Sequence, residues 1–401
     1  MTGEVGSGGK SSENLALAKS AKNDEFYTQW ADIEREMNAY LEYEPDVFRN
    51  KTVLLPCDDP EWSNFTKYFA LHFMDFGLKK LISTSYAPDS KPADIPYQPT
   101  LFETQNAQYD EAKTRSRGKK FVLTPEDINH DGVLNIEDLQ WEYLEGDGDF
   151  RSDEVTALRD EADFVITNPP FSLFRDFVGW LMQGDVKFAV IGNMNVITYK
   201  EVFPLIRDNR MWMGVTRTGV GEMWFRVYDN APEKSGQKVE NGVRYQTVGS
   251  AAWFTNIDHG RRHEPLQLMT IEDNLKFNKY IGENGYPKYD NYDAIEVGRV
   301  EAIPSDFDEA MGVPVSFLGK YNPDQFEIVG ITKTWNDHAG FKTRVYPSQI
   351  QVSANGTRSE VGKLNDGPAI RVNAVPTTTY YMVGDEMFIQ KYARLLVRLR
   401  R

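Results

Sequence analysis

Residues 162–171 read ADFVITNPPF, and this stretch decides the fold of the 401-residue chain. Its apolar run predicts a buried strand, and the two prolines that follow predict that the strand ends in a rigid loop. Three similar runs lie at residues 52–57 (TVLLPC), 80–86 (KLISTSY) and 187–192 (KFAVIG). Apolar residues at helical spacing lie between them, at residues 64–76, 172–182 and 201–207. This alternation predicts an α/β fold, in which βαβ units form a parallel sheet with helices on both faces.

The texture of the sequence changes after about residue 219, where glycines, aromatic residues and turn signals recur. Such spacing is typical of a mixed, strand-rich domain. The first 22 residues are rich in Gly, Ser, Lys and Ala and contain no apolar core. We therefore expect a flexible tail over residues 1–22, an α/β domain over residues 23–264 with an acidic insertion at 124–145, and a smaller strand-rich domain over residues 265–401.

Charge is distributed unevenly along the chain. The net charge of −15 argues at first against a nucleic-acid partner. However, residues 126–163 hold 14 acidic and 2 basic residues, whereas residues 331–401 hold 11 basic and 5 acidic residues. The C-terminal part is therefore basic, and the whole-chain charge is a poor guide to the surface that meets a partner.

Composition excludes two classes of protein. No apolar run approaches the roughly 18–20 residues needed to cross a bilayer, which argues against a membrane protein. Cys57 is the only cysteine, so an internal disulfide and a cysteine-rich zinc site are excluded. This cysteine usage fits a reducing compartment, and we expect the protein to be cytoplasmic.

The loop Asn168-Pro169-Pro170-Phe171 carries the clearest chemical signal. It directly follows a predicted strand, at the end where α/β sheets bind ligands. The prolines fix the backbone and aim two acceptors, the Asn168 side-chain oxygen and the Pro169 carbonyl, at one point. Such a pair can hold both hydrogens of an exocyclic amino group and leave the nitrogen lone pair free to attack. Phe171 offers a flat face on which an extruded base can stack. The alternative interpretation of the loop is a plain helix start that is capped by Asn168.

This loop is the signature of amino-methyltransferases, and the chain resembles the EcoRI-type adenine-specific DNA methyltransferase family. The resemblance is carried by residues 23–29 (NDEFYTQ), 55–65 (LPCDDPEWSNF), 146–152 (GDGDFRS), 167–171 (TNPPF), 191–195 (IGNMN) and 312–323 (GVPVSFLGKYNP). It covers nearly everything after residue 22. It implies a Rossmann-like S-adenosylmethionine-dependent catalytic domain, followed by a smaller target-recognition domain.

The resemblance also implies an activity: site-specific methylation of adenine N6 in double-stranded DNA, with S-adenosyl-L-methionine as cofactor. Because a duplex hides adenine N6, the target base would have to be flipped out of the helix. The enzyme would belong to a restriction–modification system with a cognate restriction endonuclease, or be a solitary phage-type enzyme. The oligomeric state stays open.

Individual roles follow from the resemblance. Tyr27 and Thr28 would line the methionine end of the cofactor, and Asp149 and Phe150 would hold its adenine. Asn168 and Phe171 would hold the target adenine. The segment that includes Pro56, Asp58, Asp59, Asn64 and Phe65 takes the place of the family's glycine-rich first motif.

One departure from the family pattern lies in that segment. The usual glycine pair is absent, and Cys57-Asp58-Asp59-Pro60-Glu61 stands in its place. We expect Asp58 or Asp59 to meet the amino group of the cofactor. The alternative for these residues is a plain turn.

A second motif, residues 127–138, fits an EF-hand-type calcium loop. Its oxygen ligands would come from Asp127, Asn129, Asp131 and, at position 12, Asp138. We expect a structural calcium ion here that braces the neighbouring cofactor segment. The alternative is an acidic, solvated turn.

Two basic stretches are weaker signals. Arg261 and Arg262 suit contacts with DNA phosphates, with a solvated loop as the alternative. Residues 391–401 include five basic residues and predict an edge strand whose charges face phosphate or water.

Two other functions remain open at the level of sequence. One is an amine methyltransferase with the same loop that acts on protein glutamine or RNA, which the basic C-terminal region disfavours. The other is a catalytically inactive DNA-binding relative, which the missing glycine pair keeps open. A measurement of cofactor binding distinguishes the inactive relative from the two kinds of methyltransferase.

Overall fold

The computed structural model describes residues 27–56, 58, 63–87, 104, 108–126, 134, 138–217, 223–227, 236–282, 285–336 and 340–400. The predicted tail at residues 1–22 lies outside these residues. The chain divides into two compact units. The first contains the residues up to Asn193 together with Met213–His259, and the second contains Met194–Trp212 together with Gly260–Arg401.

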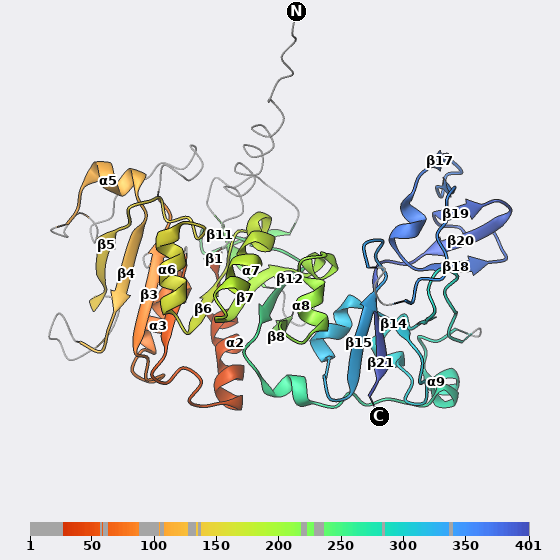
Figure 1. Ribbon diagram of the computed structural model, residues 1–401, viewed down its shortest axis with the longest axis horizontal. Coiled ribbons are helices and arrows are strands. Elements are labelled where there is room, and N and C mark those ends of the chain that lie inside the picture. The colour runs from red at the N-terminus through yellow and green to blue at the C-terminus, as the bar shows by residue number, and fades with distance from the viewer. Residues whose placement is uncertain are drawn as a thin grey trace, which may run out of the picture. The chain divides into compact units, whose positions relative to one another are not determined.

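The first unit is built on a sheet of eight strands. Their order is β5 (Gln140–Tyr143), β4 (Lys119–Leu123), β3 (Lys80–Ser85), β2 (Thr52–Leu55), β6 (Phe164–Thr167), β7 (Lys187–Asn193), β12 (Ala251–Thr255) and β8 (Trp212–Arg217) (Figure 1). The four predicted strands are confirmed as β2, β3, β6 and β7, and they are parallel. β4, β5 and β12 pair antiparallel with their neighbours, so the sheet is mixed rather than parallel throughout. An apolar run indicates that a strand is buried but does not indicate its direction. The sequence therefore did not distinguish parallel from antiparallel strands.

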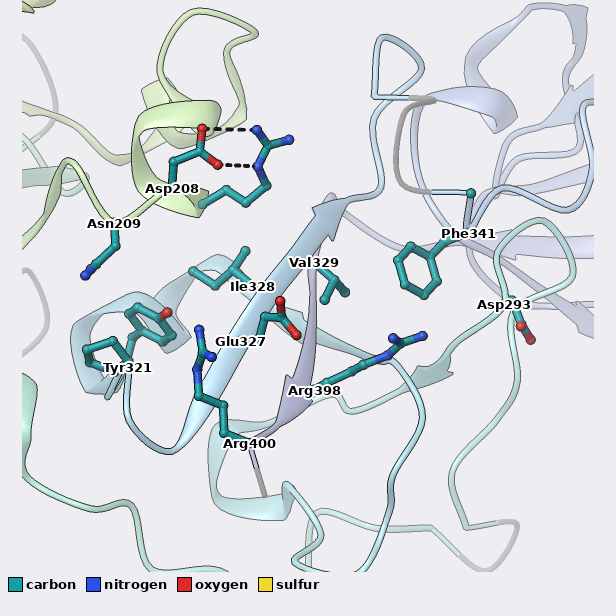
Figure 2. A pocket seen from close by; sticks show the side chains of 13 residues that line it. Asp208, Asn209, Asp293, Tyr321, Glu327, Ile328, Val329, Phe341, Arg398 and Arg400 are labelled. Atoms are coloured by element: carbon teal, nitrogen blue, oxygen red, sulfur yellow. Dashed lines mark hydrogen bonds and ion pairs between the residues drawn. The ribbon is translucent and has the colours of Figure 1, made fainter.

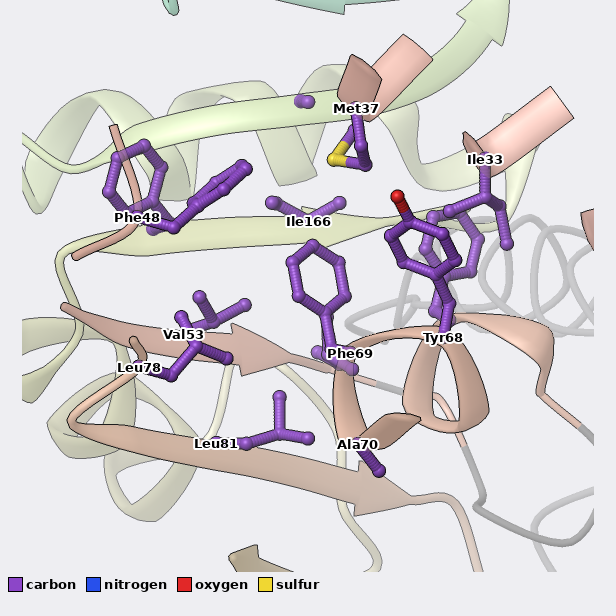
Figure 3. Packing of buried hydrophobic residues seen from close by; sticks show 14 of the residues in the cluster. Ile33, Met37, Phe48, Val53, Tyr68, Phe69, Ala70, Leu78, Leu81 and Ile166 are labelled. Atoms are coloured by element: carbon purple, nitrogen blue, oxygen red, sulfur yellow. The ribbon is translucent and has the colours of Figure 1, made fainter. Parts of the chain in front are cut away.

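Helices cover both faces of this sheet, as predicted. On one face lie α2 (Trp30–Tyr43) and α3 (Asn64–Leu71). Figure 3 shows Met37 of α2 and Phe69 of α3 pointing toward Ile166 of β6, and all three are buried in one core cluster. The opposite face carries α7 (Phe174–Gln183), whose Phe174 ring lies 5.5 Å from that of Phe254 in β12. The strands are therefore buried on both sides, which explains their continuous apolar runs.

The helix predicted at residues 64–76 is shorter than expected. α3 ends at Leu71, and turns carry the chain to Gly77, whose φ is 61°. A positive φ suits glycine and does not continue a helix, so the apolar spacing beyond Leu71 belongs to turns in which Phe73 is buried and Phe76 half-buried. The other helices of the first unit are α5 (Glu111–Ser116) and α6 (Asp153–Glu161).

A second sheet in the first unit has four short strands. Their order is β1 (Tyr27–Thr28), β9 (Trp224–Arg226), β11 (Val243–Thr247) and β10 (Gln237–Glu240). Each pair is antiparallel. β1 directly precedes α2, so this small sheet is attached to the large one through the start of the helical layer.

The second unit is rich in strands. One sheet has the order β13 (Ile295–Glu296), β14 (Met311–Pro314), β21 (Arg394–Leu399) and β15 (Phe326–Ile331). Another has the order β17 (Arg358–Glu360), β16 (Ile350–Val352), β19 (Tyr380–Val383), β20 (Glu386–Gln390) and β18 (Ala369–Val372). The helices are α8 (Phe203–Arg207), α9 (Ile271–Phe277) and the 3-10 turns η4 (Met194–Thr198), η5 (Gly260–His263), η6 (Val300–Ala302), η7 (Val315–Lys320) and η8 (Lys363–Asp366).

The prediction of an edge strand at the C-terminus is wrong. β21 lies between β14 and β15 and pairs with both. Its three consecutive residues Leu395, Leu396 and Val397 are buried, as expected for a central strand. The burial of these apolar side chains, rather than the charge of the flanking arginines, determines the position of the strand in the sheet. Among the helices of the described residues, none is both long enough and apolar enough to span a bilayer.

Candidate active site

Several of the predicted catalytic and cofactor residues lie near one edge of the large sheet. β2 is flanked by β3 on one side and β6 on the other. The strands that follow β2 in the chain are thus added first on one side of it and later on the other, which makes β2 a switch point of the sheet. The three strands are parallel, and their last residues, Leu55, Ser85 and Thr167, lie at the same edge. Open α/β sheets bind ligands at such a switch point, outside the carboxyl ends of the strands.

The Asn-Pro-Pro-Phe loop leaves this edge directly after β6. Asn168 and Phe171 are half-buried, Pro169 is buried, and Phe171 packs against the main core cluster. The 3-10 turn η3 (Phe171–Leu173) has Pro170 as its N-cap, and α7 has Leu173, with no side-chain cap at either of these described helix starts. The alternative in which Asn168 caps a plain helix start is therefore wrong. The backbone of the loop places Asn168 ahead of the helix rather than within its first turn.

Asp58 is the centre of a buried hydrogen-bond network at the same edge. Its carboxylate accepts a hydrogen bond from Thr167 Oγ1 at 2.6 Å and one from Ser63 Oγ at 2.6 Å. Its backbone carbonyl accepts from Thr66 Oγ1 at 2.8 Å and from Ser83 Oγ. Asp58 is only 7% exposed. One residue therefore joins the end of β2, the start of α3, the end of β3 and the end of β6.

This network changes the interpretation of the segment after β2. Thr167 Oγ1 also lies 2.9 Å from the Pro56 carbonyl, so Pro56 takes part through its backbone. Ser63 caps α3 by accepting from Phe65 N. The plain-turn alternative does not describe Asp58, whose carboxylate points inward to hydroxyl groups. Asp59 lies outside the described residues, and its predicted contact with the cofactor stays a prediction.

Asn64 acts on the neighbouring strand. Its side-chain amide donates to the Thr28 carbonyl at 2.7 Å, which fixes β1 against the start of α3. The Thr28 hydroxyl is buried and has no hydrogen-bond partner among the described residues. An orphaned hydroxyl beside Tyr27 fits a site that holds the polar amino-acid end of a ligand. Phe65, in contrast, is a core residue, 2% exposed and 5.8 Å from the Trp253 ring.

Asp149 lies in a loop that closely approaches the end of β3. A Cβ at Gly148, whose φ is +89°, would lie 2.4 Å from the Ser85 carbonyl oxygen, so only glycine fits there. The Asp149 carboxylate pairs with the Arg151 guanidinium at 2.5 Å and accepts from Arg151 N at 2.8 Å. Burial alone would raise the pKa of Asp149, but the Arg151 hydrogen bonds outweigh it, and the pKa lies below its ordinary value. The carboxylate is therefore held ionised and fixed in place.

Phe150 sits differently from its predicted role. It is 2% exposed, and its ring contacts Phe177 at 4.9 Å and Trp180 at 5.7 Å, both in α7. A ring covered on these sides offers little surface to a cofactor adenine. The geometry favours a packing role for Phe150 and leaves Asp149 as the polar group of this loop.

The calcium motif gains no support. Asp127, Asn129 and Asp131 lie outside the described residues, and Asp138 is buried. Within the described part of the chain, no group of three or more His, Cys, Asp or Glu side chains is placed to hold a metal ion.

Arg262, predicted to contact DNA phosphate, is occupied elsewhere. It is 6% exposed, its guanidinium lies 3.6 Å from the centre of the Trp212 ring, and it donates to Asn209 Oδ1 at 2.6 Å. Burial and these contacts argue against a phosphate contact by Arg262. Arg261, beside it in η5, is half-buried, and its predicted role stays a prediction.

The basic C-terminal strand borders a hollow within the second unit. Figure 2 shows Arg398 reaching toward Phe341, over whose ring it lies at 5.0 Å, and Glu327 between Arg398 and Arg400. The hollow has a volume of about 630 Å³, and its lining includes three arginines and three carboxylates. Its charges are thus balanced, so it is not a concentrated anion site.

The first unit is therefore an α/β domain with the Asn168-Pro169-Pro170-Phe171 loop at the switch point of its sheet. A fold and a loop of this kind are expected of methyltransferases that act on an exocyclic amine. The family model described as "Adenine-specific methyltransferase EcoRI" matches residues 14–399, and the chain belongs to this family. The resemblance inferred from the sequence is confirmed.

Three relatives show the same relationship. Type II methyltransferase M.EcoRI of Escherichia coli is 42% identical over 323 residues, which are 80% of this chain and 89% of the relative. Type II methyltransferase M.MpnI of Mycoplasma pneumoniae is 35% identical over 78% of this chain and 83% of its own length. Type II methyltransferase M.MgeORF184P of Mycoplasma genitalium is 32% identical over 86% and 94%. No solved structure was found that matches the chain.

Proposed function

We propose that this chain is a site-specific DNA adenine N6-methyltransferase that uses S-adenosyl-L-methionine. The observation that carries the proposal is the Asn168-Pro169-Pro170-Phe171 loop, which leaves the sheet at the carboxyl end of β6, beside β2. Family membership over residues 14–399 supports it. The order of strands around β2 supports a Rossmann-like catalytic domain. The strand-rich second unit, basic over residues 331–401, would provide target recognition in double-stranded DNA.

The chemistry assigned to this loop is positioning. The Asn168 side-chain oxygen and the Pro169 carbonyl accept the two N6 hydrogens of a flipped adenine, and Phe171 stacks on its ring. When bound, S-adenosylmethionine supplies an electrophilic methyl group on a sulfonium. Thr28 and Asp149 would hold its two polar ends, and the network around Asp58 would keep the cofactor segment in register with the loop. No metal is needed for this step, because the methyl group on the sulfonium is already activated and the protein supplies position and alignment.

The test uses purified full-length protein, plasmid DNA and isotopically labelled S-adenosylmethionine. Digested DNA should contain N6-methyladenine by mass spectrometry, and sequencing of DNA from an expressing host should show one modified motif. Asn168→Ala should lose the product while calorimetry still detects cofactor binding. Cofactor binding without DNA methylation, but with methylated RNA or glutamine peptide, would favour the other amine methyltransferases. Absence of cofactor binding would favour an inactive relative.

A further inference from the structure

The four-stranded sheet of the first unit carries a row of aromatic and basic residues across all its strands. Tyr27 in β1 lies opposite Arg226 in β9, Arg226 lies opposite Tyr245 in β11, and Tyr245 lies opposite Lys238 in β10. Residues directly opposite one another project from the same face of a sheet, with Cβ atoms about 4.5–5.5 Å apart. Trp224, two residues before Arg226, shares that face. We call these five residues the aromatic–basic row.

Burial shows that the row faces away from the core. The alternate residues of the same strands, Thr28 and Phe225, are 3% and 0% exposed, and Phe225 belongs to the main core cluster. Arg226 is exposed, and the other members of the row are half-buried. The guanidinium of Arg226 has no ion-pair partner among the described residues. The row is therefore a surface and not part of the packing.

Cations and rings alternate along this surface and contact one another. Lys238 Nζ lies 4.5 Å from the centre of the Trp224 ring and 5.8 Å from that of Tyr245. Glu240, two residues after Lys238, pairs with its ammonium group at 3.1 Å. Among the described residues, the face thus offers two cations and three rings against one carboxylate, in a chain whose net charge is −15. An anionic partner with flat, stackable groups complements such a surface.

One end of the row lies at the proposed active site. Tyr27 and Thr28 are the residues that the family resemblance assigns to the methionine end of the cofactor, and Thr28 is held by Asn64 at the start of α3. A strand of nucleic acid that leaves the active site along this sheet would therefore meet Arg226 and Trp224 in β9 first, and then Tyr245 in β11 and Lys238 in β10. Flipping one adenine exposes the bases and the backbone beside it.

We propose that the aromatic–basic row binds the DNA strand that carries the target adenine, at the nucleotides next to the flipped base. Arg226 and Lys238 contact phosphates, while Tyr245 and Trp224 contact the faces of unstacked bases. The proposal rests on the proposed function and adds to it a surface, outside the catalytic loop, that holds the substrate strand. Its contacts are independent of base identity, so it contributes affinity rather than sequence recognition.

The experiment compares Arg226→Gln, Lys238→Gln, their double variant and Tyr245→Ala with the wild type. The matched control is Arg244→Gln, a cation in the same strand as Tyr245 whose side chain projects from the opposite face. Binding of fluorescent duplex DNA of a sequence that the wild type methylates is measured from low to physiological salt. Cofactor affinity is measured by calorimetry and folding by thermal unfolding.

Each lost phosphate contact should reduce the slope of log K against log salt by about 0.9, so the double variant should lose about 1.8. Tyr245→Ala should weaken DNA binding roughly 5- to 150-fold, the usual range for one stacked base. Cofactor affinity and the Arg244→Gln variant should stay within about twofold of the wild type. Glu240→Gln should tighten DNA binding, because it removes the carboxylate that pairs with Lys238 within the described part of the chain.

Wild-type methylation of DNA together with unchanged salt slopes in the arginine and lysine variants would overturn the surface and leave the enzyme assignment intact. A wild type that neither binds nor methylates DNA would instead overturn the proposed function. If the charge-removing variants unfold, Glu240→Gln decides. Tighter binding supports the surface, and unchanged binding contradicts it.

Discussion

Replacing Thr167 by valine tests whether the Asp58 network positions the catalytic loop. The Thr167 hydroxyl lies 2.6 Å from the Asp58 carboxylate and 2.9 Å from the Pro56 carbonyl, and it is the last side chain before Asn168. Valine preserves the size, the β-branch and the strand preference of threonine. The substitution therefore removes one hydroxyl group and very little else.

The expected magnitude follows from burial. Thr167 is 1% exposed and Asp58 7% exposed, so water does not replace the lost donor. A hydrogen bond to a charged group contributes about 1.5–3 kcal/mol. For a unit of this size, that predicts a fall in melting temperature of roughly 3–12 °C. A displacement of about 1 Å at a reacting group can lower the rate about 100-fold. We therefore expect kcat to fall between tenfold and a hundredfold, because the loop loses its register with the segment after β2.

The assay separates positioning from cofactor binding. Single-turnover methylation gives the rate of transfer, calorimetry gives the dissociation constant for S-adenosylmethionine, and thermal unfolding gives stability. Thr167→Val and Asp58→Asn should both slow transfer and leave cofactor affinity within about threefold. Thr52→Val, a buried threonine at the opposite end of β2, is the control and should transfer methyl groups at nearly the wild-type rate.

Two results would refute this reasoning. Wild-type transfer rates and stability in Thr167→Val would show that the network does not position the loop. A large loss of cofactor affinity in Asp58→Asn, with Thr167→Val unaffected, would show instead that Asp58 binds the cofactor directly.

Three further predictions concern the same edge of the sheet. Asn168→Ala should lower kcat about 100- to 1,000-fold, as for other positioned hydrogen-bond groups, with cofactor affinity unchanged by calorimetry. Gly148→Ala should lower stability by about 1–3 kcal/mol in denaturant unfolding because of its φ of +89°, whereas Gly146→Ala, with open space around it, should be nearly neutral. Asp149 contributes stability that is present above its ordinary pKa of 3.8 and is lost as the pH falls through its lower folded value. Arg151→Gln should therefore raise the pKa of Asp149 in an NMR titration and leave less stability to lose in acid; an unchanged pKa would contradict the pairing.

The parallel strands were predictable because of how they are buried. β2, β3, β6 and β7 have helices on both faces, so each reads as a short continuous apolar run. The antiparallel neighbours of these strands were not predictable from the sequence, because strand pairing depends on contacts between distant parts of the chain. β12, for example, pairs with β7 across about sixty residues of sequence.

The catalytic loop was predictable from four consecutive residues, but its support was not. The hydroxyls that surround Asp58 come from three segments, at Ser63 and Thr66, at Ser83, and at Thr167. Each is an ordinary residue of a helix, a helix cap or a strand when taken alone. Only Ser63 carried a local signal, as a serine directly before an apolar helix. For Arg262 the sequence pattern was misleading, because an arginine in a basic cluster is expected to be exposed. The contact of its side chain with Trp212 depends on the fold and could not be predicted from the sequence.

The missing glycine pair can now be given a physical explanation. Glycines after the first strand normally allow the backbone to approach a ligand closely and turn sharply. Here Asp58 provides a fixed point, because its carboxylate accepts hydrogen bonds from Ser63 at the start of α3 and from Thr167 at the end of β6. The close approach of backbones occurs one strand away, where a Cβ at Gly118 would lie 2.7 Å from the Ser85 carbonyl. Asp58 is thereby linked to Thr167, which directly precedes Asn168, so substitutions at Asp58 should disturb methyl transfer even where they leave cofactor affinity unchanged.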